Sequence, residues 1–356
     1  MPSTPTPGAP AVTVRAPAQQ LSALLGAVER WPVLLDHVVY ALRTPDGETE
    51  RVEVWTRDGE RITHWWGEHR TAPDGLRTDF RHSPAPGSPA TVTGHWVLTP
   101  EEGDGGTGLA LRLDRDSAGA PLAGAGPAGA GADAAAPPSP EAPPTAGAAE
   151  VAEVFRLHAE ADPGLVFTFQ DTLRTTAPAE PVLDFLRRVR DWPGAVSHIA
   201  TVSVTETAPG VQSVVSGVRA PDGSVQDVPS VRLVLADRVV YTPLTVPPFA
   251  SAHLGEWIVG TAPDGATTVT GRHTVALRAD RLAAAFGPGT TPADAQRRVR
   301  AALGAHSLAT LDAARADAES RTAPAPAPVP APAPVSAAVP APVPASASAP
   351  VSGGHR

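Results

Sequence analysis

The segments VERWPVLLDH at residues 28–37 and VRDWPGAVSH at residues 189–198 share a Trp-Pro dipeptide and a closing histidine. Trp31 and Trp192 lie 161 positions apart (192 minus 31), and His37 and His198 keep this offset. The same offset relates three further pairs: Ala16-Pro17-Ala18 and Ala177-Pro178-Ala179, Phe80 and Tyr241, and Gly94-His95-Trp96 and Gly255-Glu256-Trp257. Because tryptophan and proline are among the matches, the constant offset indicates a duplicated domain.

Two segments of biased composition lie within the first copy and after the second. Residues 117–147 are almost wholly Ala, Gly and Pro, and residues 322–352 form an Ala-Pro-Val tract. Such segments cannot build a core, so we expect domains at 11–162 and 164–320 and a disordered tail at 321–356. The glycine pattern at 124–129 follows no predicted strand, which argues against a nucleotide-binding loop.

Each copy follows one order of predicted elements. We expect first helices over residues 20–28 and 179–189, ended or kinked by the Trp-Pro, and closing helices over 146–161 and 291–320. The last of these carries apolar Val299, Leu303, Leu308 and Leu311. Strands are expected at 11–16, 51–55, 61–69, 76–81 and 91–98, and at 165–175, 211–218, 228–235, 239–241, 253–259 and 267–277. This order predicts α+β domains, each an antiparallel sheet curled around a long C-terminal helix.

Composition excludes several function classes. The 356 residues contain no cysteine and no lysine, so thiol nucleophiles, disulfides and lysine Schiff bases are excluded. The net charge of -9 argues against nucleic-acid binding. The first ten residues do not resemble a signal peptide, and no apolar run is long enough to span a membrane. We therefore expect a cytoplasmic protein.

The richest chemistry in copy one lies in the strand at residues 64–70, HWWGEHR. Residues alternate between the faces of a strand, so Trp65, Gly67 and His69 share one face. If that face points inward, His69 lies among aromatic walls that can tune its pKa. The alternative interpretation is a core tryptophan beside a structural, hydrogen-bonded histidine.

In copy two the matching strand places Ser230 at the position of Gly67 and Arg232 at that of His69, at a local offset of 163. An arginine that faces into a curled sheet must be paired or must meet a ligand oxygen. Alternatively, Arg232 lies on the outer face or pairs with Asp237 or Asp227.

Other residues offer weaker signals. The spacing of His64, His69, His82 and His95 matches no known metal site. Two arginine clusters, at 187–190 and 297–300, read as solvated helix faces or as a docking patch for an acidic partner. Hydrolase and P-loop motifs are missing from the sequence, and no dinucleotide motif stands between a predicted strand and a helix.

The Trp-Pro, the Asp-Gly hairpin before the tryptophan strand, the Gly-x-Trp strand and the duplication together resemble the two-domain aromatase/cyclases of bacterial type II polyketide synthases. That family belongs to the START/Bet v1-like helix-grip superfamily, and the resemblance covers residues 11–320. In the family, Ser and Arg of the tryptophan strand line an interior pocket. Copy one keeps Trp65 and Glu68 but has Gly67 and His69, whereas copy two keeps Ser230 and Arg232 but has Val228 near the tryptophan position. Which domain carries the chemistry is therefore open.

The resemblance implies first-ring (C7–C12) aldol cyclisation, dehydrative aromatisation, or both, of a poly-β-ketone tethered to an acyl carrier protein, with type II synthase components as partners and with no metal or cofactor. Under this hypothesis His69 shuttles protons, and Arg232 with Ser230 binds carbonyl or enolate oxygens. The full set of expected catalytic residues is His69, Arg70, Ser230 and Arg232. The expected substrate-binding residues are Trp65, Trp66, Arg81, Trp96, Tyr241, His253 and Trp257. The alternatives are a non-catalytic carrier of a lipid or polyketide, and a scaffold for synthase partners.

Overall fold

The computed structural model describes residues 11–59, 61–84, 91–101, 105–116, 148–220 and 222–322. The insertion at 117–147, with its glycine pattern, and the tail beyond residue 322 lie outside the described residues. The described residues up to Thr322 group into one compact unit, so the predicted boundary between the copies at 162–164 stays a prediction. Among the described helices, none is long and apolar enough to cross a membrane.

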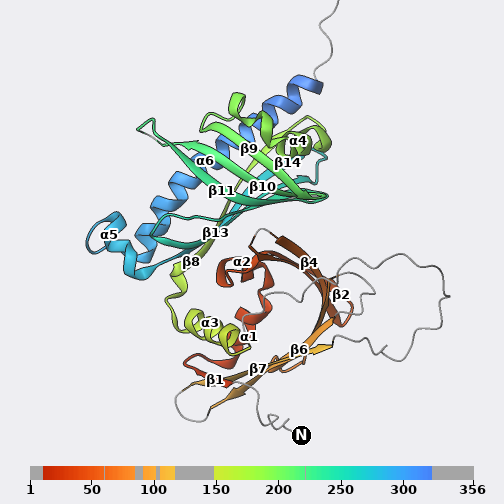
Figure 1. The fold of residues 1–356 in the computed structure, drawn as a ribbon, viewed down its shortest axis with the longest axis vertical. Coiled ribbons are helices and arrows are strands. Elements are labelled where there is room, and N and C mark those ends of the chain that lie inside the picture. The colour runs from red at the N-terminus through yellow and green to blue at the C-terminus, as the bar shows by residue number, and fades with distance from the viewer. Residues whose placement is uncertain are drawn as a thin grey trace, which may run out of the picture. The chain divides into compact units, whose positions relative to one another are not determined.

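Each copy forms one antiparallel sheet of seven strands, and the two sheets have the same strand order (Figure 1). In the first sheet the order is β1-β7-β6-β5-β4-β3-β2, and in the second it is β8-β14-β13-β12-β11-β10-β9. The first sheet comprises β1 (Ala11–Val14), β2 (Val38–Asp46), β3 (Thr49–Asp58), β4 (Arg61–Thr71), β5 (Arg77–Ser83), β6 (Thr91–Pro100) and β7 (Thr107–Asp116). The second comprises β8 (Val166–Thr175), β9 (Ile199–Ala208), β10 (Val211–Arg219), β11 (Val225–Val234), β12 (Arg238–Pro243), β13 (Ala250–Thr261) and β14 (Thr267–Leu277).

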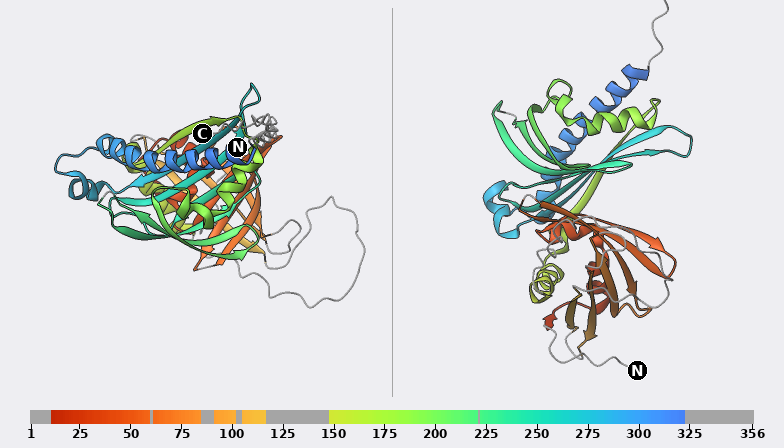
Figure 2. Two further views of the ribbon diagram at one scale, coloured as in Figure 1. Left: turned by 90° about the horizontal axis from the view of Figure 1, so that it is seen from above. Right: turned by 45° about the vertical axis from the view of Figure 1, so that its right-hand side comes forward.

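Helices close the concave side of each sheet, and Figure 2 shows the strands of the second sheet curling around α6. Copy one contains α1 (Ala18–Gly26), η1 (Val28–Arg30), α2 (Trp31–Leu34) and α3 (Ala148–Glu160). Copy two contains η2 (Pro163–Leu165), α4 (Ala179–Arg187), η3 (Val189–Gly194), η4 (Ala279–Arg281), α5 (Leu282–Phe286) and α6 (Pro292–Thr322). The predicted α+β class, with a long helix closing an antiparallel sheet, is confirmed.

Several sequence predictions of local structure need correction. Strands β2, β7 and β9 were not predicted, although each pairs along most of its length with a neighbour. The Trp-Pro dipeptides do not end the first helices, because α1 ends at Gly26 and α4 ends at Arg187. The Trp-Pro begins α2 in copy one and lies inside η3 in copy two. Leu308 is 37% exposed, since it lies off the buried stripe of α6 that runs through Val299 and Leu311. The predicted tail begins later than residue 321, because α6 continues through Thr322.

The repeated tryptophans explain why the Trp-Pro recurs. Trp31 donates its indole N–H to the carbonyl of Leu25 over 3.2 Å, and Trp192 donates to the carbonyl of Phe185 over the same distance. Each indole also lies edge-on to the tryptophan of its own Gly-x-Trp strand, Trp96 in one copy and Trp257 in the other. In both copies the tryptophan of the Trp-Pro therefore links the C-terminal end of the first helix to the sheet.

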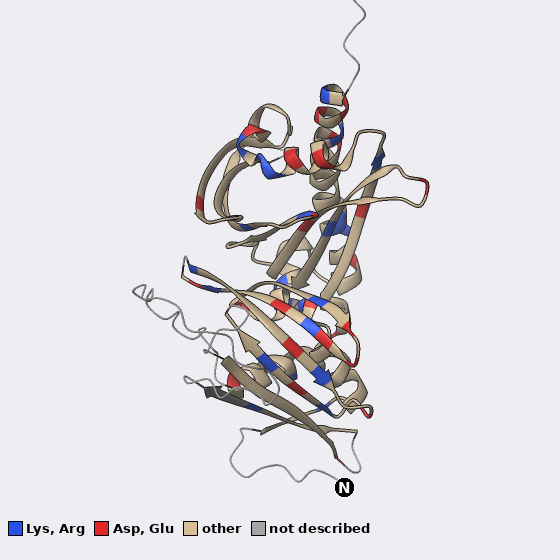
Figure 3. Ribbon diagram, turned by 90° about the vertical axis from the view of Figure 1, so that its right-hand side faces the viewer, with Lys and Arg blue, Asp and Glu red and all other residues tan. Residues whose placement is uncertain are grey.

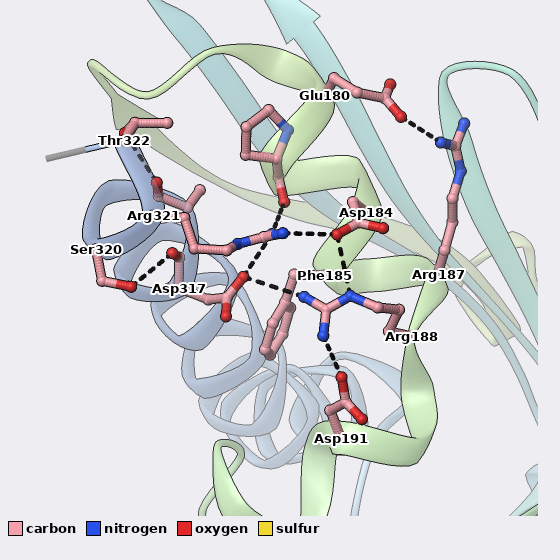
Figure 4. Close-up of polar contacts among 12 residues, drawn as sticks. Glu180, Asp184, Phe185, Arg187, Arg188, Asp191, Asp317, Ser320, Arg321 and Thr322 are labelled. Carbon is pink, nitrogen blue, oxygen red and sulfur yellow. Dashed lines mark hydrogen bonds and ion pairs between the residues drawn. The ribbon is translucent and has the colours of Figure 1, made fainter.

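An ion-pair network fastens α4 to the C-terminal part of α6 (Figure 4). Arg321 bridges Asp184 on α4 at 2.7 Å and Asp317 on its own helix at 2.6 Å. Arg188 contacts the same two carboxylates and also pairs with Asp191. Both arginines of this network, Arg188 and Arg321, are therefore paired with carboxylates of the same chain.

The two predicted arginine clusters are paired internally, so neither is a single-sign docking patch. Arg187 pairs with Glu180, and Arg297 pairs with Asp294. Arg300 is 40% exposed, pairs with Asp171 at 2.5 Å and lies over the ring of Phe169. Figure 3 shows acidic and basic positions interspersed along the strands and helices in that view.

Candidate functional site

The second copy encloses a pocket of about 460 Å³ between its sheet and α6. The sheet contributes Ser230 and Arg232 from β11, Tyr241 from β12, His253 and Trp257 from β13, and His273 from β14. The helical side contributes Trp192, His198, Leu303, His306, Ser307 and Thr310. The predicted residues of copy two are thus brought together in one cavity, as the alternation of strand residues suggested.

Arg232 is a buried cation without a carboxylate partner among the contacts of the described residues. The residue is 2% exposed, and its side chain donates to Gln212 Oε1 over 2.9 Å and to the carbonyl of Leu186 over 2.7 Å. The alternative that Asp237 neutralises it is wrong, because Asp237 pairs with Arg238. Burial lowers the pKa of Arg232 to about 9, so the guanidinium still carries its charge at neutral pH.

Two neighbouring tryptophans contact this guanidinium. Its central carbon lies 5.2 Å from the ring of Trp192 and 5.8 Å from that of Trp257. The Nε of Arg232 has no hydrogen-bond partner. An unpaired buried charge with one free donor is costly, and an enolate or carbonyl oxygen would relieve that cost.

Beside Arg232, two histidines form a hydrogen-bonded pair on neighbouring strands. His253 Nε2 and His273 Nδ1 are 3.1 Å apart, and the Tyr241 hydroxyl lies 3.5 Å from the same Nδ1. Burial lowers the pKa of His253 to about 3 and that of His273 to about 4, so both rings are neutral at pH 7. The other nitrogen of His273, Nε2, is buried without a partner.

A second pair of imidazoles lies on the helical side of the same pocket. The rings of His198 and His306 stack with centroids 4.4 Å apart and planes inclined by 7°. Burial and the neighbouring His306 lower the pKa of His198 to about 4. His198 Nδ1 and the hydroxyl of Ser307 are both buried and unpartnered.

The buried polar side-chain atoms that lack a partner in the described part of the chain all belong to residues that line this pocket. They are His198 Nδ1, Arg232 Nε, Trp257 Nε1, His273 Nε2 and Ser307 Oγ. Buried polar groups in native proteins are nearly always satisfied. Five unsatisfied groups around one cavity therefore point to a ligand with several oxygen atoms.

The first copy has a smaller cavity of about 130 Å³, and its walls are almost entirely apolar. His69 lies in it, 3% exposed, and its Nε2 is 2.8 Å from His82 Nε2. Burial lowers the pKa of His69 to about 3, helped by the charges of His82 and Arg43. Trp65, which alternation put on the same face as His69, and Trp96, also expected to bind substrate, line this cavity as well.

Three residues of the predicted set do not reach the cavity of copy one. Arg70 and Arg81 are exposed, and Trp66 stacks on His64 at 3.8 Å on the other face of β4. Strand alternation explains this, because these residues occupy positions of opposite parity to the wall residues. The structure thus gives no support to a catalytic role for Arg70 or to substrate contacts by Trp66 and Arg81.

Known proteins resemble this chain along most of its length, although no family model matches it. The bifunctional cyclase/dehydratase of the actinorhodin polyketide synthase from Streptomyces coelicolor is 33% identical over 318 residues, which cover 85% of this chain and 94% of that protein. The granaticin counterpart from Streptomyces violaceoruber is 30% identical and covers 84% of this chain and 90% of its own length.

The chain belongs to the polyketide synthase bifunctional cyclase/dehydratases.

Solved structures agree with this membership. The crystal structure of a di-domain ARO/CYC from the steffimycin biosynthetic pathway matches the cyclase/dehydratase with a TM-score of 0.71 and 25% identity, over 87% of this chain and 98% of that one. A di-domain ARO/CYC from the BE-7585A pathway matches with a TM-score of 0.68 and 26% identity, over 87% and 97% of the two chains. The predicted resemblance to two-domain aromatase/cyclases is confirmed.

Sequence reasoning missed several pocket residues of the cyclase/dehydratase. His82, His273, His306 and Ser307 were not among the predicted site residues, and His198 was noted only as part of the repeat. His273 could have been found from strand alternation, since it has the same parity as the buried Gly271 on β14. His306 and Ser307 could not, because they fall inside a helix whose apolar stripe predicts only core contacts.

The buried histidines make the stability of the cyclase/dehydratase sensitive to acid. His69 and His273 titrate near pH 6.5 in the unfolded chain, and burial lowers their pKa in the folded protein to about 3 and about 4. Below pH 6.5 the unfolded chain therefore binds protons that the folded chain does not. The free energy of unfolding has its full value above this pH and decreases as the pH falls towards 4. We expect the free energy of unfolding to decline by up to about 1.4 kcal/mol per pH unit for each such group.

Urea unfolding at pH 7, 6 and 5 measures this dependence. His273→Gln should reduce its slope, because the variant has one titrating group fewer. An unfolding free energy that stays constant between pH 7 and pH 5 would contradict the burial of neutral histidines.

Proposed function

We propose that this cyclase/dehydratase catalyses first-ring (C7–C12) aldol cyclisation, dehydrative aromatisation, or both, of a poly-β-ketone bound to an acyl carrier protein, and that the chemistry takes place in the pocket of the second copy. The observation that carries the proposal is the gathering of the five unpartnered polar atoms around that pocket. A poly-β-ketone presents carbonyl oxygens along its length, which suits a cavity with several free hydrogen-bonding groups.

Arg232 is assigned to the oxygen that gains negative charge. Removing a proton from a methylene between two carbonyls leaves an enolate, whose oxygen can accept from the free Nε of Arg232. The guanidinium is already fixed by Gln212 and Leu186, so little reorganisation is needed when the charge develops. Ser230 lies two residues away on the same face, and its hydroxyl makes a long hydrogen bond of 3.4 Å to the carbonyl of Val214 that a substrate oxygen could replace.

We assign the proton transfers to His273, and His253 accepts a proton from it. Because the pKa of His273 is lowered, its ring is neutral and its Nε2 can accept the methylene proton. The Nδ1 proton can then pass to Nε2 of His253, 3.1 Å away. The enolate carbon bonds to a distant carbonyl carbon, and the new alkoxide regains a proton from the histidine pair. Loss of the resulting hydroxyl with a second methylene proton releases one water.

In this proposal His273 takes the proton-shuttle role that the sequence suggested for His69. The Nε2 of His69 is engaged by His82, and its cavity is the smaller and less polar of the two. The named relatives are components of polyketide synthases, which supports type II synthase components as partners, delivery of the substrate by a carrier protein, and a cytoplasmic location.

A reconstituted minimal synthase tests this function against the carrier alternative. Adding the protein should change the products from spontaneously cyclised chains to one regiospecific aromatic ring, detected by mass spectrometry and NMR. The relatives named as cyclase/dehydratases favour this outcome over a carrier. Binding or protection of the chain with no new ring pattern would overturn the proposed catalysis.

A further inference from the structure

The cavity of the first copy lacks most of the polar groups that the sheet supplies to the pocket of the second copy, although Trp96 occupies the position of Trp257. Arg232 pairs with Tyr241 across β11 and β12, and the equivalent pair across β4 and β5 is His69 with Phe80. A cation and a phenol in one copy are thus replaced by a neutral imidazole and a hydrocarbon ring in the other.

The remaining positions follow the same trend. Ser230 is paired with Pro243, whereas its counterpart Gly67 is paired with His82. A Cβ atom at Gly67 would overlap the imidazole of His82, so the glycine is what allows this ring to reach His69. His253 has Val92 as its counterpart at the common offset of 161 (253 minus 92), and Val92 lines the smaller cavity.

The polar side chains on the sheet side of the smaller cavity contact one another. His69 and His82 share one hydrogen bond, and the hydroxyl of Thr56 accepts from the indole of Trp65 over 3.1 Å. The five buried unpartnered atoms of the described chain all belong to residues that line the other pocket. Since a buried water needs about two to four polar partners, this cavity suits an apolar occupant better than water.

The cavity of the first copy has aromatic walls, and its volume fits one aromatic ring. Phe80 lies 5.0 Å from Trp96, and Trp31 lies edge-on to Trp96 at 6.1 Å between ring centroids. The cavity measures about 130 Å³, and an apolar cavity of about 150 Å³ engineered in another protein binds benzene. Aromatic rings favour such tilted and edge-on neighbours.

We propose that the cavity of the first copy is a binding site for a single neutral aromatic ring, separate from the pocket in which the chemistry takes place. An anionic ring is excluded, because the cavity offers no buried cation corresponding to Arg232. This inference does not depend on the proposed reaction, since its occupant is recognised by shape and neutrality alone.

Titration of the full-length protein with fluorobenzene, followed by ¹⁹F NMR, tests the site. We expect saturable binding, and we expect Val92→Phe, which fills the cavity, to weaken it by at least about tenfold. The matched control is His253→Phe, the same substitution at the equivalent position of the larger pocket, which should leave the affinity unchanged. Fluorobenzoate should not bind to the first copy.

Two further measurements keep the test decisive if Val92→Phe does not fold. Val151→Phe fills the same cavity from α3, and a crystal soaked with bromobenzene locates the ring directly through its bromine. Absence of saturable binding would overturn the proposal. Binding that is weakened by His253→Phe but not by the cavity-filling variants would place the ring in the catalytic pocket and would overturn it as well. Neither readout involves turnover, so failure here is distinguishable from failure of the proposed reaction.

Discussion

Replacing Arg232 with glutamine is expected to slow ring formation by at least about 100-fold, the loss typical when a donor to a developing oxyanion is removed. The side chain offers a fixed positive charge with no carboxylate partner among the described residues, and its Nε has no hydrogen-bond partner. Glutamine keeps a polar side chain but has no charge, so the enolate loses its principal stabilisation. The measurement is the initial rate of aromatic product in the reconstituted synthase.

Two controls separate catalysis from folding. Arg219→Gln changes an exposed arginine of the same sheet and should leave the rate unchanged. Arg232→Lys keeps the charge but loses the forked donors, so an intermediate rate is expected. A folded Arg232→Gln protein that forms product at the normal rate would contradict the assignment of this residue.

Replacing Trp192 with alanine should lower the free energy of unfolding by about 3–5 kcal/mol, the usual cost of deleting a large buried aromatic side chain. Trp192 is 4% exposed, donates to the carbonyl of Phe185 and lies edge-on to Trp257. Its loss leaves a cavity and an unsatisfied carbonyl at the end of α4. Chemical denaturation monitored by circular dichroism measures the effect.

The matched variants are Trp192→Phe and Trp31→Ala. Phenylalanine restores most of the buried area but not the N–H donor, so it should recover most of the lost stability. Trp31 has the same contacts in copy one and should show a loss of similar size. A Trp192→Ala protein that is destabilised by less than about 1 kcal/mol would show that the repeated tryptophan does not fasten the helix to the sheet.

The duplication and the fold class could be predicted because they depend on patterns that a sequence displays directly. The offset between Trp31 and Trp192 aligned the copies, and strand alternation put Trp65 and His69 on one face of their strand and Ser230 and Arg232 on one face of theirs. The structure shows that both faces point inward. The local offset of 163 at Ser230 and Arg232 is confirmed by the pairing of both strands with their neighbours.

The partners of these residues could not be predicted, because they come from distant segments. The His69 and His82 pair depends on a glycine across the strand, and the environment of Arg232 depends on Leu186 and Trp192. Hydrophobic periodicity also hides function inside α6, where His306 and Ser307 occupy core-facing positions. The difference in polarity between the two cavities is therefore a result of the structure.

The most direct test of the central claim is a crystal structure of the protein with an unreactive poly-β-ketone mimic, in which the reacting methylenes are replaced by oxygen or sulfur. We predict that the mimic occupies the pocket of the second copy, with one of its oxygens within hydrogen-bond distance of Arg232 Nε and a neighbouring atom within reach of His273 Nε2. A mimic whose carbonyl groups lie in the cavity of the first copy, or one that leaves Arg232 Nε without a contact, would contradict the assignment of the chemistry to the second copy.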